Sequence, residues 1–262
     1  MMGPVYFVGA GPGDPELLTI KGRRLLDEAD VIIYAGSLVN PALLPDLKGR
    51  DGKKRKIYDS AGMTLDETTT VLREAASAGL LAVRLHSGDI SFYSAITEQI
   101  TLLEKDGIEC VVVPGVSSLG AGAAALGTEL TVPEVSQTVI VTRMAGRTPV
   151  PASESLGGLA AHRSTMVIFL SAGMIDGVVA GLLEGGYPPE TPAAIVERAS
   201  WPEERVITGS LEDIAAKAEE AGIKKTALIF VGEALSRGDV LRRSRLYSVD
   251  FSHGYREQKR KR

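Results

Sequence analysis

The sequence predicts an α/β protein with two domains, and two features of the chain lead to this expectation. Short apolar runs rich in valine, isoleucine and leucine alternate with stretches of helical periodicity along the 262 residues. The runs show little polar alternation, as expected of strands buried on both faces of a sheet. A helix of small residues at 116–126 follows Pro114 and Gly115, and a new series of strands begins after it. We therefore expect domains at 1–115 and 116–235, followed by a basic tail at 236–262.

The expected elements follow the same alternation along the whole chain. Strands are expected at 4–9, 30–35, 80–86, 109–114, 136–143, 165–170, 193–197 and 226–232. Helices are expected at 15–28, 64–78, 92–104, 116–126, 152–161, 174–185 and 211–220. Thr64 and Glu67 have the spacing of a capping box, so this sequence pattern marks the start of the second helix, and Gly79 closes it.

The composition predicts a soluble cytoplasmic protein and argues against an extended nucleic-acid interface. The net charge is −4 and the mean hydropathy is +0.09. No apolar stretch reaches the roughly 18 residues that a membrane span needs. The tail at 236–262 holds nine basic and three acidic residues, so the rest of the chain is acidic and would repel a phosphate backbone. The one cysteine, Cys110, is expected to be a buried side chain, and no disulfide can form within the chain, which fits a reducing compartment.

The first strand runs into a turn that contains Gly9, Gly11 and Gly13, which is typical of a nucleotide-like ligand site. The spacing differs from that of a dinucleotide-binding turn, because Asp14 stands where the third glycine is needed for close packing. Pro12 also removes an amide that would face a pyrophosphate. The second strand ends without an acid to hold a ribose. A pyrophosphate ligand is therefore disfavoured.

A ligand with an adenosine group and a positive centre fits this turn better, and S-adenosylmethionine is such a ligand. It has no phosphates, and its sulfonium tolerates nearby carboxylates and carbonyl oxygens. Gly88 and Asp89 follow the strand at 80–86, which places a second Gly-Asp pair at a strand end. Strand ends are where open α/β sheets bind ligands. Two such pairs in one domain favour this cofactor.

Three segments that carry these pairs resemble the N-terminal signatures of the tetrapyrrole methylases, which use S-adenosylmethionine. The segments are Val8–Thr19, Ser87–Asp89 and Val113–Ser118. The resemblance extends over 4–235 and includes the second domain through 166–170, 192–196 and 226–227. It implies the tetrapyrrole methylase fold, with two α/β domains and the cofactor cleft between them. It also implies S-adenosylhomocysteine as the product, a small-molecule tetrapyrrole substrate and a homodimer.

Further segments resemble one subgroup of this family, whose members methylate carbon 11 of a contracted, heavily carboxylated ring in cobalamin biosynthesis. These segments are Tyr34–Asn40, Pro133–Thr138, Thr142–Pro149 and Ala199–Glu204. Ile90 is a departure, because the family usually has proline there, and the loop is expected to be less rigid. The sequence leaves open whether the ring is metal-free or carries cobalt.

The resemblance implies an in-line methyl transfer in which the ring carbon is itself the nucleophile. Such a reaction needs no protein nucleophile, and the sequence has no Ser-His-Asp order. His86, His162 and His253 lie far apart along the chain, so we expect no metal site. Positioning of the reactants can lower the barrier by several kcal/mol, up to about 7–11 in favourable cases.

The resemblance also assigns roles to particular residues. The expected cofactor contacts are Pro12, Gly88, Asp89, Ile90, Ser117, Ser118, Leu170, Ala194, Thr226 and Ala227. Sequence alone favours core packing for Leu170 and Ala194, and helix capping is an open alternative for the two serines. Asp14 and Asp89 are the catalytic candidates, Asp14 for proton removal and Asp89 for an effect on the sulfonium or amino group. A helix N-cap is an equally strong expectation for Asp14.

Cations and aromatic rings are the candidates for binding the carboxylated ring. They are Lys21, Tyr34, Tyr93, Arg143, Arg147 and Arg198. Arginine suits bidentate binding of a carboxylate, although each of these cations is also consistent with an ordinary surface charge. The two tyrosines are equally consistent with core positions.

Three alternative functions stay open at this stage. A methylase acting at another ring position is the nearest, and the subgroup segments argue against it. An NAD(P)-dependent oxidoreductase would need the missing ribose acid. A nucleic-acid-binding module would use the basic tail and would bind with strong salt dependence.

Overall fold

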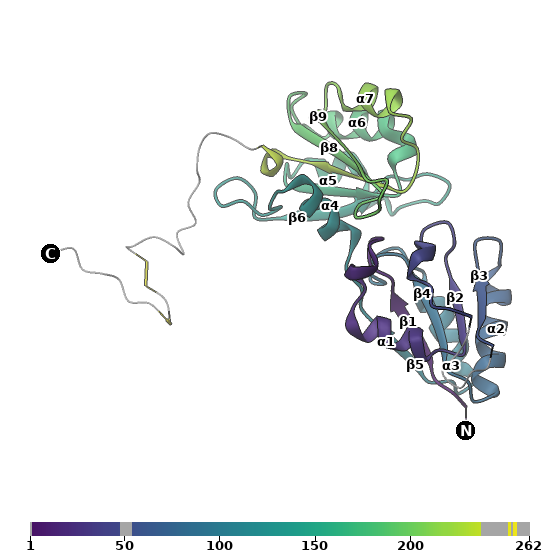
Figure 1. Cartoon of the computed structure of the whole chain (residues 1–262). Helices are drawn as coiled ribbons and strands as arrows, with labels where there is room; N and C mark the ends of the chain where they lie inside the picture. Colours follow the sequence, from purple (N-terminus) through teal and green to yellow (C-terminus); the bar gives the residue numbers. More distant parts are fainter. Residues whose placement is uncertain (1, 48–53, 237–250, 253, 256–262) are drawn as a thin grey trace. The chain divides into compact units, whose positions relative to one another are not determined.

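The computed structural model describes residues 2–47, 54–236, 251–252 and 254–255, and these contain two separate five-stranded sheets (Figure 1). The chain divides into two units. The first unit comprises 1–122 together with the segment 198–205, and the second comprises 123–197 and the chain from 206 onward. The return of 198–205 to the first unit was not expected from the sequence. Most of the basic tail at 236–262 lies outside the described residues.

The first unit is built on a parallel sheet with the strand order β3-β2-β4-β1-β5. Its strands are β1 (Val5–Gly9), β2 (Val31–Tyr34), β3 (Lys56–Asp59), β4 (Ala82–His86) and β5 (Cys110–Val113). The helices along this part of the chain are α1 (Ile20–Glu28), α2 (Leu65–Ser77), α3 (Ile96–Lys105) and α4 (Ser118–Leu126). Because all its strands are parallel, their carboxyl ends lie at one edge of the sheet, where ligands bind in such folds.

Both faces of this sheet are buried, as the apolar runs in the sequence predict. Val8, Ile32 and Leu85 pack with Leu25 and Leu26 of α1 on one face. The other face buries a separate group against α2 and α3: Phe7, Ile33, Leu72, Ala76 and Leu103. Helices therefore cover both faces of the sheet.

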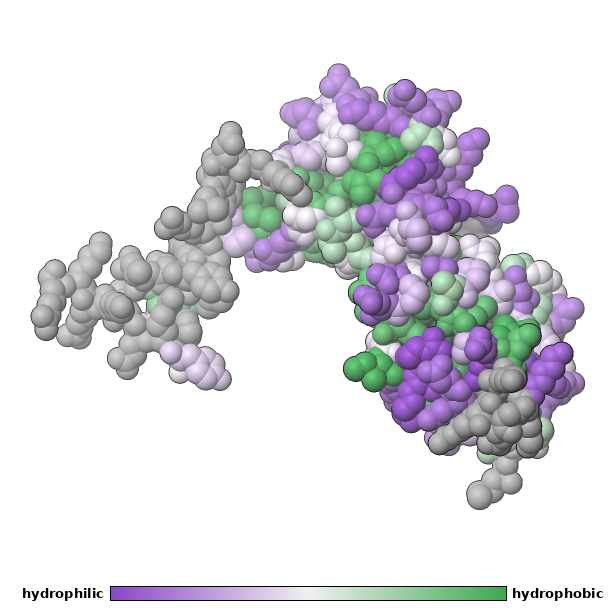
Figure 2. All heavy atoms as spheres, in the orientation of Figure 1, coloured by the Kyte–Doolittle hydropathy of each residue, from purple (hydrophilic) through white to green (hydrophobic). Residues whose placement is uncertain are grey.

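The second unit contains a mixed sheet with the order β6-β7-β10-β8-β9. Its strands are β6 (Val139–Arg143), β7 (Thr165–Phe169), β8 (Pro192–Glu197), β9 (Arg205–Ser210) and β10 (Ala227–Val231). β6 and β7 are parallel, whereas β10 is antiparallel to both β7 and β8. Helices α5 (Leu156–Ala160), α6 (Ile175–Glu184) and α7 (Ile214–Glu220) pack on one face of the sheet through a single apolar core. Hydrophilic residues predominate around α7, and hydrophobic residues reach the surface beside β8 and β9 (Figure 2).

The sequence missed two strands, and the physical reason is the same for both. β3 and β9 are edge strands with largely exposed or half-buried residues, so they lack the continuous apolar run of a central strand. The expected helix at 15–28 is also wrong at its start. A 3₁₀ helix at Pro15–Leu17 comes first, and α1 then begins after Thr19, whose side chain accepts a hydrogen bond from the Gly22 amide.

Other element boundaries differ by a few residues. The helix expected at 92–104 is α3 at 96–105, and the one expected at 152–161 is a 3₁₀ helix at 152–154 followed by α5. The strand expected at 136–143 starts at Val139. No helix within the described ranges is long and apolar enough to cross a membrane.

The capping box at the start of α2 is confirmed. The Thr64 hydroxyl accepts a hydrogen bond from the Glu67 amide at 3.2 Å, and the Glu67 carboxylate accepts one from the Thr64 amide at 2.7 Å. Hydrogen bonds from Thr64 lower the pKa of Glu67. The bond from the Thr64 backbone amide has the larger effect, and the bond from the Thr64 side chain has the smaller one. The capping box therefore satisfies two amides that the helix itself cannot pair.

We predict that Thr64→Ala lowers the free energy of unfolding by about 1 kcal/mol, because the Glu67 amide loses its partner. Urea denaturation followed by circular dichroism measures this change. Thr70→Ala is the matched control, since Thr70 is exposed in the middle of the same helix and alanine is the better helix former. Equal stability of the two variants would contradict a stabilising role for the cap.

Candidate active site

The loops that follow β1, β4 and β5 meet backbone against backbone at the carboxyl edge of the first sheet. The Gly11 amide donates to the Gly88 carbonyl at 3.1 Å, and the Gly88 amide donates to the Gly11 carbonyl at 2.8 Å. A Cβ atom added to Gly9 would lie 2.6 Å from Gly115 Cα, and one added to Gly115 would lie 2.3 Å from the Gly88 carbonyl oxygen. Only glycine permits this approach, so the three loops form one close-packed cluster.

The Asp89 side chain connects the loop after β4 to the loop after β5. One carboxylate oxygen accepts a hydrogen bond from the Gly115 amide at 2.8 Å, and the other accepts one from the Ser91 amide at 2.9 Å. Burial acts to raise the pKa of Asp89, but hydrogen bonds from Ser91, Gly115 and Ile90 outweigh it and lower that pKa. The carboxylate is therefore ionised at neutral pH and fixed in orientation beside the glycine cluster.

The glycine-rich turn after β1 is held by side chains that the sequence analysis did not single out. The Trp201 indole donates to the Pro12 carbonyl at 2.8 Å, and the Asn40 amide group donates to the Gly13 carbonyl at 2.9 Å. The Ser200 hydroxyl accepts a hydrogen bond from the Asp14 amide at 3.0 Å. A Cβ atom on residue 13 would lie 2.1 Å from the Trp201 ring, which explains the glycine there.

These residues come from distant parts of the chain, which is why periodicity could not find them. Asn40 starts the short 3₁₀ helix Pro41–Leu43, and Ser200 and Trp201 lie between β8 and β9. Two signals in the sequence pointed to them. The segments Tyr34–Asn40 and Ala199–Glu204 resemble the methylase subgroup, and Trp201 is the only tryptophan of the chain.

Asp14 caps the 3₁₀ helix at Pro15–Leu17 by accepting a hydrogen bond from the Glu16 amide at 2.8 Å. The structure therefore gives this side chain the capping role that the sequence analysis considered as the alternative. Ser117 also caps: its hydroxyl accepts a hydrogen bond from the Leu119 amide at 3.2 Å in the first turn of α4. Ser118 begins α4 and lies close to Gly88. A catalytic function for Asp14 stays a prediction.

Within the first unit, the structure brings most of the expected cofactor residues to one edge. Pro12, Gly88, Asp89, Ser117 and Ser118 all belong to the loops at the carboxyl ends of β1, β4 and β5. Ile90 differs from these, since its side chain is buried in the core with Phe7 and Leu103. Only the backbone of Ile90 is left for contact with a ligand.

Within the second unit, three of the expected residues lie at one end of the sheet. Ile229 of β10 lies opposite Ile168 of β7, and continuing this register places Ala227 opposite Leu170. Leu170 has a φ of 54° and Thr226 a φ of 55°, both in the left-handed region that non-glycine residues avoid. Leu170 is 64% exposed, so the core position favoured by sequence alone is wrong. Strained backbone of this kind is concentrated at functional sites.

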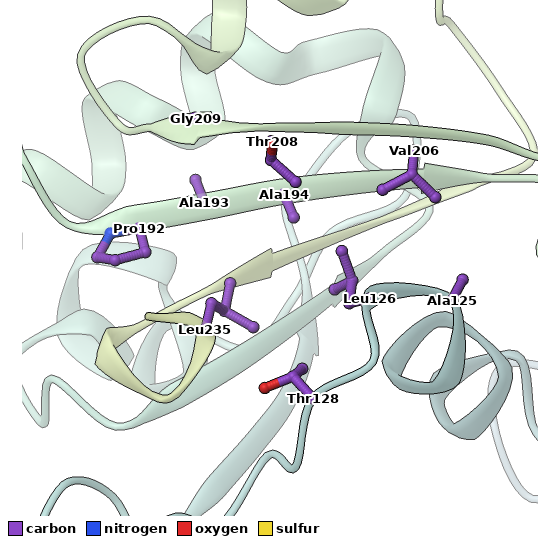
Figure 3. Close-up of a pocket in the computed structure, with 10 residues that line it drawn as sticks. All are labelled: Ala125, Leu126, Thr128, Pro192, Ala193, Ala194, Val206, Thr208, Gly209 and Leu235. Atoms are coloured by element: carbon purple, nitrogen blue, oxygen red, sulfur yellow. The ribbon is translucent and has the colours of Figure 1, made fainter. Parts of the chain in front are cut away.

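Ala194 lies in the middle of β8 and is buried, as sequence alone favoured. It lines a pocket of about 440 Å³ on the second unit, on the sheet face opposite α5, α6 and α7. Figure 3 shows Ala194 projecting toward Leu126 and Leu235, with Val206 and Thr208 on the neighbouring strand β9. The lining is mainly apolar, which suits a flat hydrophobic group.

The candidate substrate-binding residues are divided between the two units. Lys21 is exposed on α1, Tyr34 is half-buried at the end of β2, and Tyr93 is 44% exposed. Arg143 donates to the carbonyls of Thr148 and Pro149, and Arg147 is exposed in the same loop. Arg198 lies 4.0 Å from the Glu203 carboxylate and 5.8 Å from the centre of the Trp201 ring. Their contacts with a substrate remain predictions.

His86 is the last residue of β4, and its ring is enclosed. It is 6% exposed, stacks on Phe7 with ring centres 6.2 Å apart, and its Nε2 has no hydrogen-bond partner among the described residues. Burial, and then the nearby charge of Arg84, lower the pKa of His86 to about 3. The imidazole is therefore neutral at neutral and mildly acidic pH.

The chain belongs to the tetrapyrrole (corrin/porphyrin) methylase family, whose model matches residues 4–215. Two curated relatives have closely related names. The chain is 55% identical over 257 residues to a cobalt-precorrin-4 C(11)-methyltransferase of Methanocaldococcus jannaschii, covering 98% of this chain and 97% of the relative. It is 45% identical over 252 residues to a precorrin-4 C(11)-methyltransferase of Pseudomonas aeruginosa, covering 96% of this chain and 98% of the relative.

Solved structures show the same fold. A crystal structure of a cobalt precorrin-4 methyltransferase, described as a cobalamin biosynthetic enzyme, matches with a TM-score of 0.84 and 41% identity, covering 89% of this chain and 96% of that one. A uroporphyrin-III C-methyltransferase of Thermus thermophilus, complexed with S-adenosylhomocysteine, matches with a TM-score of 0.73 and 33% identity, covering 89% and 99% respectively. The expected tetrapyrrole methylase fold is therefore confirmed.

We predict that Asp89→Ala destabilises the first unit by roughly 1.5–3 kcal/mol, because the Gly115 and Ser91 amides lose a charged acceptor. Asp89→Asn keeps one acceptor oxygen and is expected to lose less. Urea denaturation measures the overall change, and hydrogen exchange at the Gly115 amide reports the local one. Unchanged hydrogen exchange at the Gly115 amide in Asp89→Ala would contradict the role of Asp89 in connecting the two loops.

We also predict that His86 makes the protein sensitive to acid. Its folded-state pKa lies below the unfolded value of 6.5, so its contribution to stability is complete above pH 6.5 and is lost as the pH falls toward 3. The free energy of unfolding should then fall by up to about 1.4 kcal/mol per pH unit from this group. Urea denaturation between pH 6 and 4 is expected to show this slope in the parent protein and its loss in His86→Leu. The exposed His162 gives the control variant His162→Leu, and an equal slope in all three proteins would contradict the prediction.

Proposed function

We propose that this chain transfers a methyl group from S-adenosylmethionine to carbon 11 of precorrin-4 or cobalt-precorrin-4 in cobalamin biosynthesis. The similarity over nearly the full length to two C(11)-methyltransferases is the observation that carries the proposal. The cofactor is supported by the S-adenosylhomocysteine complex of a related methyltransferase. The enzyme class follows from the family itself.

The residues of the first unit fit this cofactor. The cluster of Gly9, Gly88 and Gly115 presents backbone without side chains at the carboxyl edge, and any Cβ atom on Gly9 or Gly115 would disrupt it. Asp89 adds a fixed negative charge, which suits a ligand with a cationic sulfonium and ammonium group. When bound, S-adenosylmethionine supplies an electrophilic methyl group. We assign Gly88, Asp89, Ile90, Ser117 and Ser118 to hold its methionine portion, with Pro12 in the first loop.

The chain contributes positioning to the reaction. Within the turn at Gly11–Asp14, three carbonyls and two amides are hydrogen-bonded to Gly88, Asn40, Ser200 and Trp201, so the loop has a fixed conformation without a ligand. Preorganised loops of this kind lower the barrier by holding the reacting groups in line. Asp14 and Asp89 are our candidates for proton removal and charge stabilisation. Leu170, Ala194, Thr226 and Ala227 are our candidates for enclosing the adenine.

Cobalt-precorrin-4 is the better-supported substrate form. The relative of Methanocaldococcus jannaschii at 55% identity has a name that specifies cobalt, whereas relatives with the metal-free name are 43–46% identical to this chain. Lys21, Tyr34, Tyr93, Arg143, Arg147 and Arg198 are our candidates for binding the ring. Methylation at another ring position is the nearest alternative.

We also propose that the enzyme is a cytoplasmic homodimer. Val112 on edge strand β5 is 47% exposed, and Val116, which precedes α4, is 36% exposed. Helix α4 is rich in alanine and glycine, and only Ala121 and Gly122 are buried. An exposed apolar surface next to a sheet edge suits a second copy of the chain. The single cysteine fits a reducing compartment.

The testing experiment is a paired turnover assay with the purified protein and S-adenosylmethionine. One sample receives precorrin-4 and the other cobalt-precorrin-4. Mass spectrometry counts the added methyl groups, and NMR of a ¹³C-labelled methyl group locates the carbon. We expect one methyl at carbon 11, with faster turnover of the cobalt form. No transfer in either sample, with S-adenosylhomocysteine still bound, would reject the substrate and retain the cofactor.

A further inference from the structure

The first unit buries two arginine side chains, and the two differ in how their charge is satisfied. Arg55 is 3% exposed, and each of its three side-chain nitrogens donates to a carbonyl oxygen: Ala29 at 2.8 Å, Asp46 at 2.5 Å and Asp27 at 2.6 Å. This guanidinium links the carboxyl end of α1 to the backbone at Asp46. Its function is therefore explained by the fold.

Arg84 on β4 is 8% exposed, and its three hydrogen bonds are longer than those of Arg55 and come from only two of its nitrogens. Its Nε donates to Gln99 at 3.2 Å, and its Nη1 donates to the Ser60 hydroxyl at 2.9 Å and to the Ile33 carbonyl at 3.4 Å. Within the described ranges, Nη2 has no hydrogen-bond partner and no carboxylate forms an ion pair with this side chain. Burial without a compensating anion lowers the pKa of Arg84 to about 10.

The position of this guanidinium points to a ligand site. Arg84 lies beside Ile33 and Phe7 in the register of the sheet, and Ser60 directly follows the end of β3. The guanidinium therefore lies just under the carboxyl edge of the strands, on the face covered by α2 and α3. His86 Nε2 and Thr191 Oγ1 are the fully enclosed side-chain atoms without a partner in the described structure. Arg84 Nη2 is not among them, so it keeps contact with solvent.

A buried cation without a neighbouring anion is unfavourable, and a bound ligand that carries a negative charge reduces this cost. Arginine at such a place forms strong, charge-assisted hydrogen bonds to a carboxylate. The neighbouring titratable group, His86, is neutral and cannot supply the missing negative charge. No side chain of the described part of the first unit supplies a negative charge to Arg84, and its solvent-accessible Nη2 is open to a ligand that does.

We propose that Arg84 is a substrate-binding residue whose free Nη2 receives a carboxylate of the tetrapyrrole ring. The proposal rests on the proposed function, because a carboxylated ring bound at this edge is what supplies the anion. Arg84 then contributes to substrate affinity and takes no part in binding the cofactor. Gln99 and Ser60 hold the guanidinium in the orientation that leaves Nη2 free.

The test compares Arg84→Met and Arg84→Lys with the matched control Arg55→Met. For Arg84→Met we expect KM for cobalt-precorrin-4 to rise about tenfold or more, with kcat changed less than about threefold. The Kd of S-adenosylhomocysteine, measured by calorimetry, is expected to stay within about twofold of the parent value. Arg84→Lys keeps the charge but cannot reach Gln99, Ser60 and an anion together, so an intermediate KM is expected.

Stability separates binding from a structural role. Removing an uncompensated buried charge is expected to leave the melting temperature of Arg84→Met equal to or above that of the parent protein. Arg55→Met is expected to melt at a lower temperature, because three carbonyls lose their donor. A lowered melting temperature for Arg84→Met with an unchanged KM would overturn the proposal. If that variant does not fold, Arg84→Lys decides, and a KM within twofold of the parent value overturns it.

A binding measurement keeps this test independent of the proposed reaction. Uroporphyrin III, a polycarboxylated tetrapyrrole, serves as the probe, and its fluorescence reports binding to each protein. Weaker binding by Arg84→Met supports the proposal, even if neither precorrin is methylated by the parent protein. Equal binding by the parent protein and Arg84→Met, or no binding by the parent protein, overturns it.

Discussion

The close approach of three backbone loops at one edge of the parallel sheet is the constraint on which the rest of the first unit depends. Gly9, Gly88 and Gly115 come so near to one another that a Cβ atom on Gly9 or Gly115 would force the loops apart. Hydrogen bonds between Gly11 and Gly88, and from Gly115 to Asp89, then hold the contact. The result is an edge formed by backbone atoms and one ionised carboxylate. This surface suits a ligand that carries positive charge and no phosphate.

Charge is distributed unevenly at this edge. Asp89 is stabilised as an anion by hydrogen bonds from backbone amides, so its charge is available without a bound cation. Arg84 is in the opposite situation, because burial opposes its charge and no acid in the described part of the unit compensates it. Arg55, in contrast, uses all three of its side-chain nitrogens in hydrogen bonds to backbone carbonyls. Buried charged groups that lack a full set of hydrogen-bond or charge partners often occur at binding sites.

The second unit shows a related feature in its backbone. Leu170 follows β7 and Thr226 precedes β10, and both have positive φ values at the same end of the sheet. Each such residue stores about 1–3 kcal/mol of strain, which the surrounding strands must hold in place. Strain at these two neighbouring strand ends supports the proposal that Leu170 and Thr226 contact a ligand.

The sequence by itself determined the α/β class, the central strands, the capping box at Thr64 and the glycine-rich turn, since periodicity, caps and glycine spacing are local signals. Family resemblance added the methylase fold and the cofactor. Only the tertiary structure decided that edge strands β3 and β9 form, because their residues gain burial from neighbours and carry no apolar pattern of their own. It also decided that Asn40, Ser200 and Trp201 hold the first loop and that Arg84 lacks an anion. Those contacts join residues up to 189 positions apart, and no local pattern in a single sequence encodes which distant groups will meet.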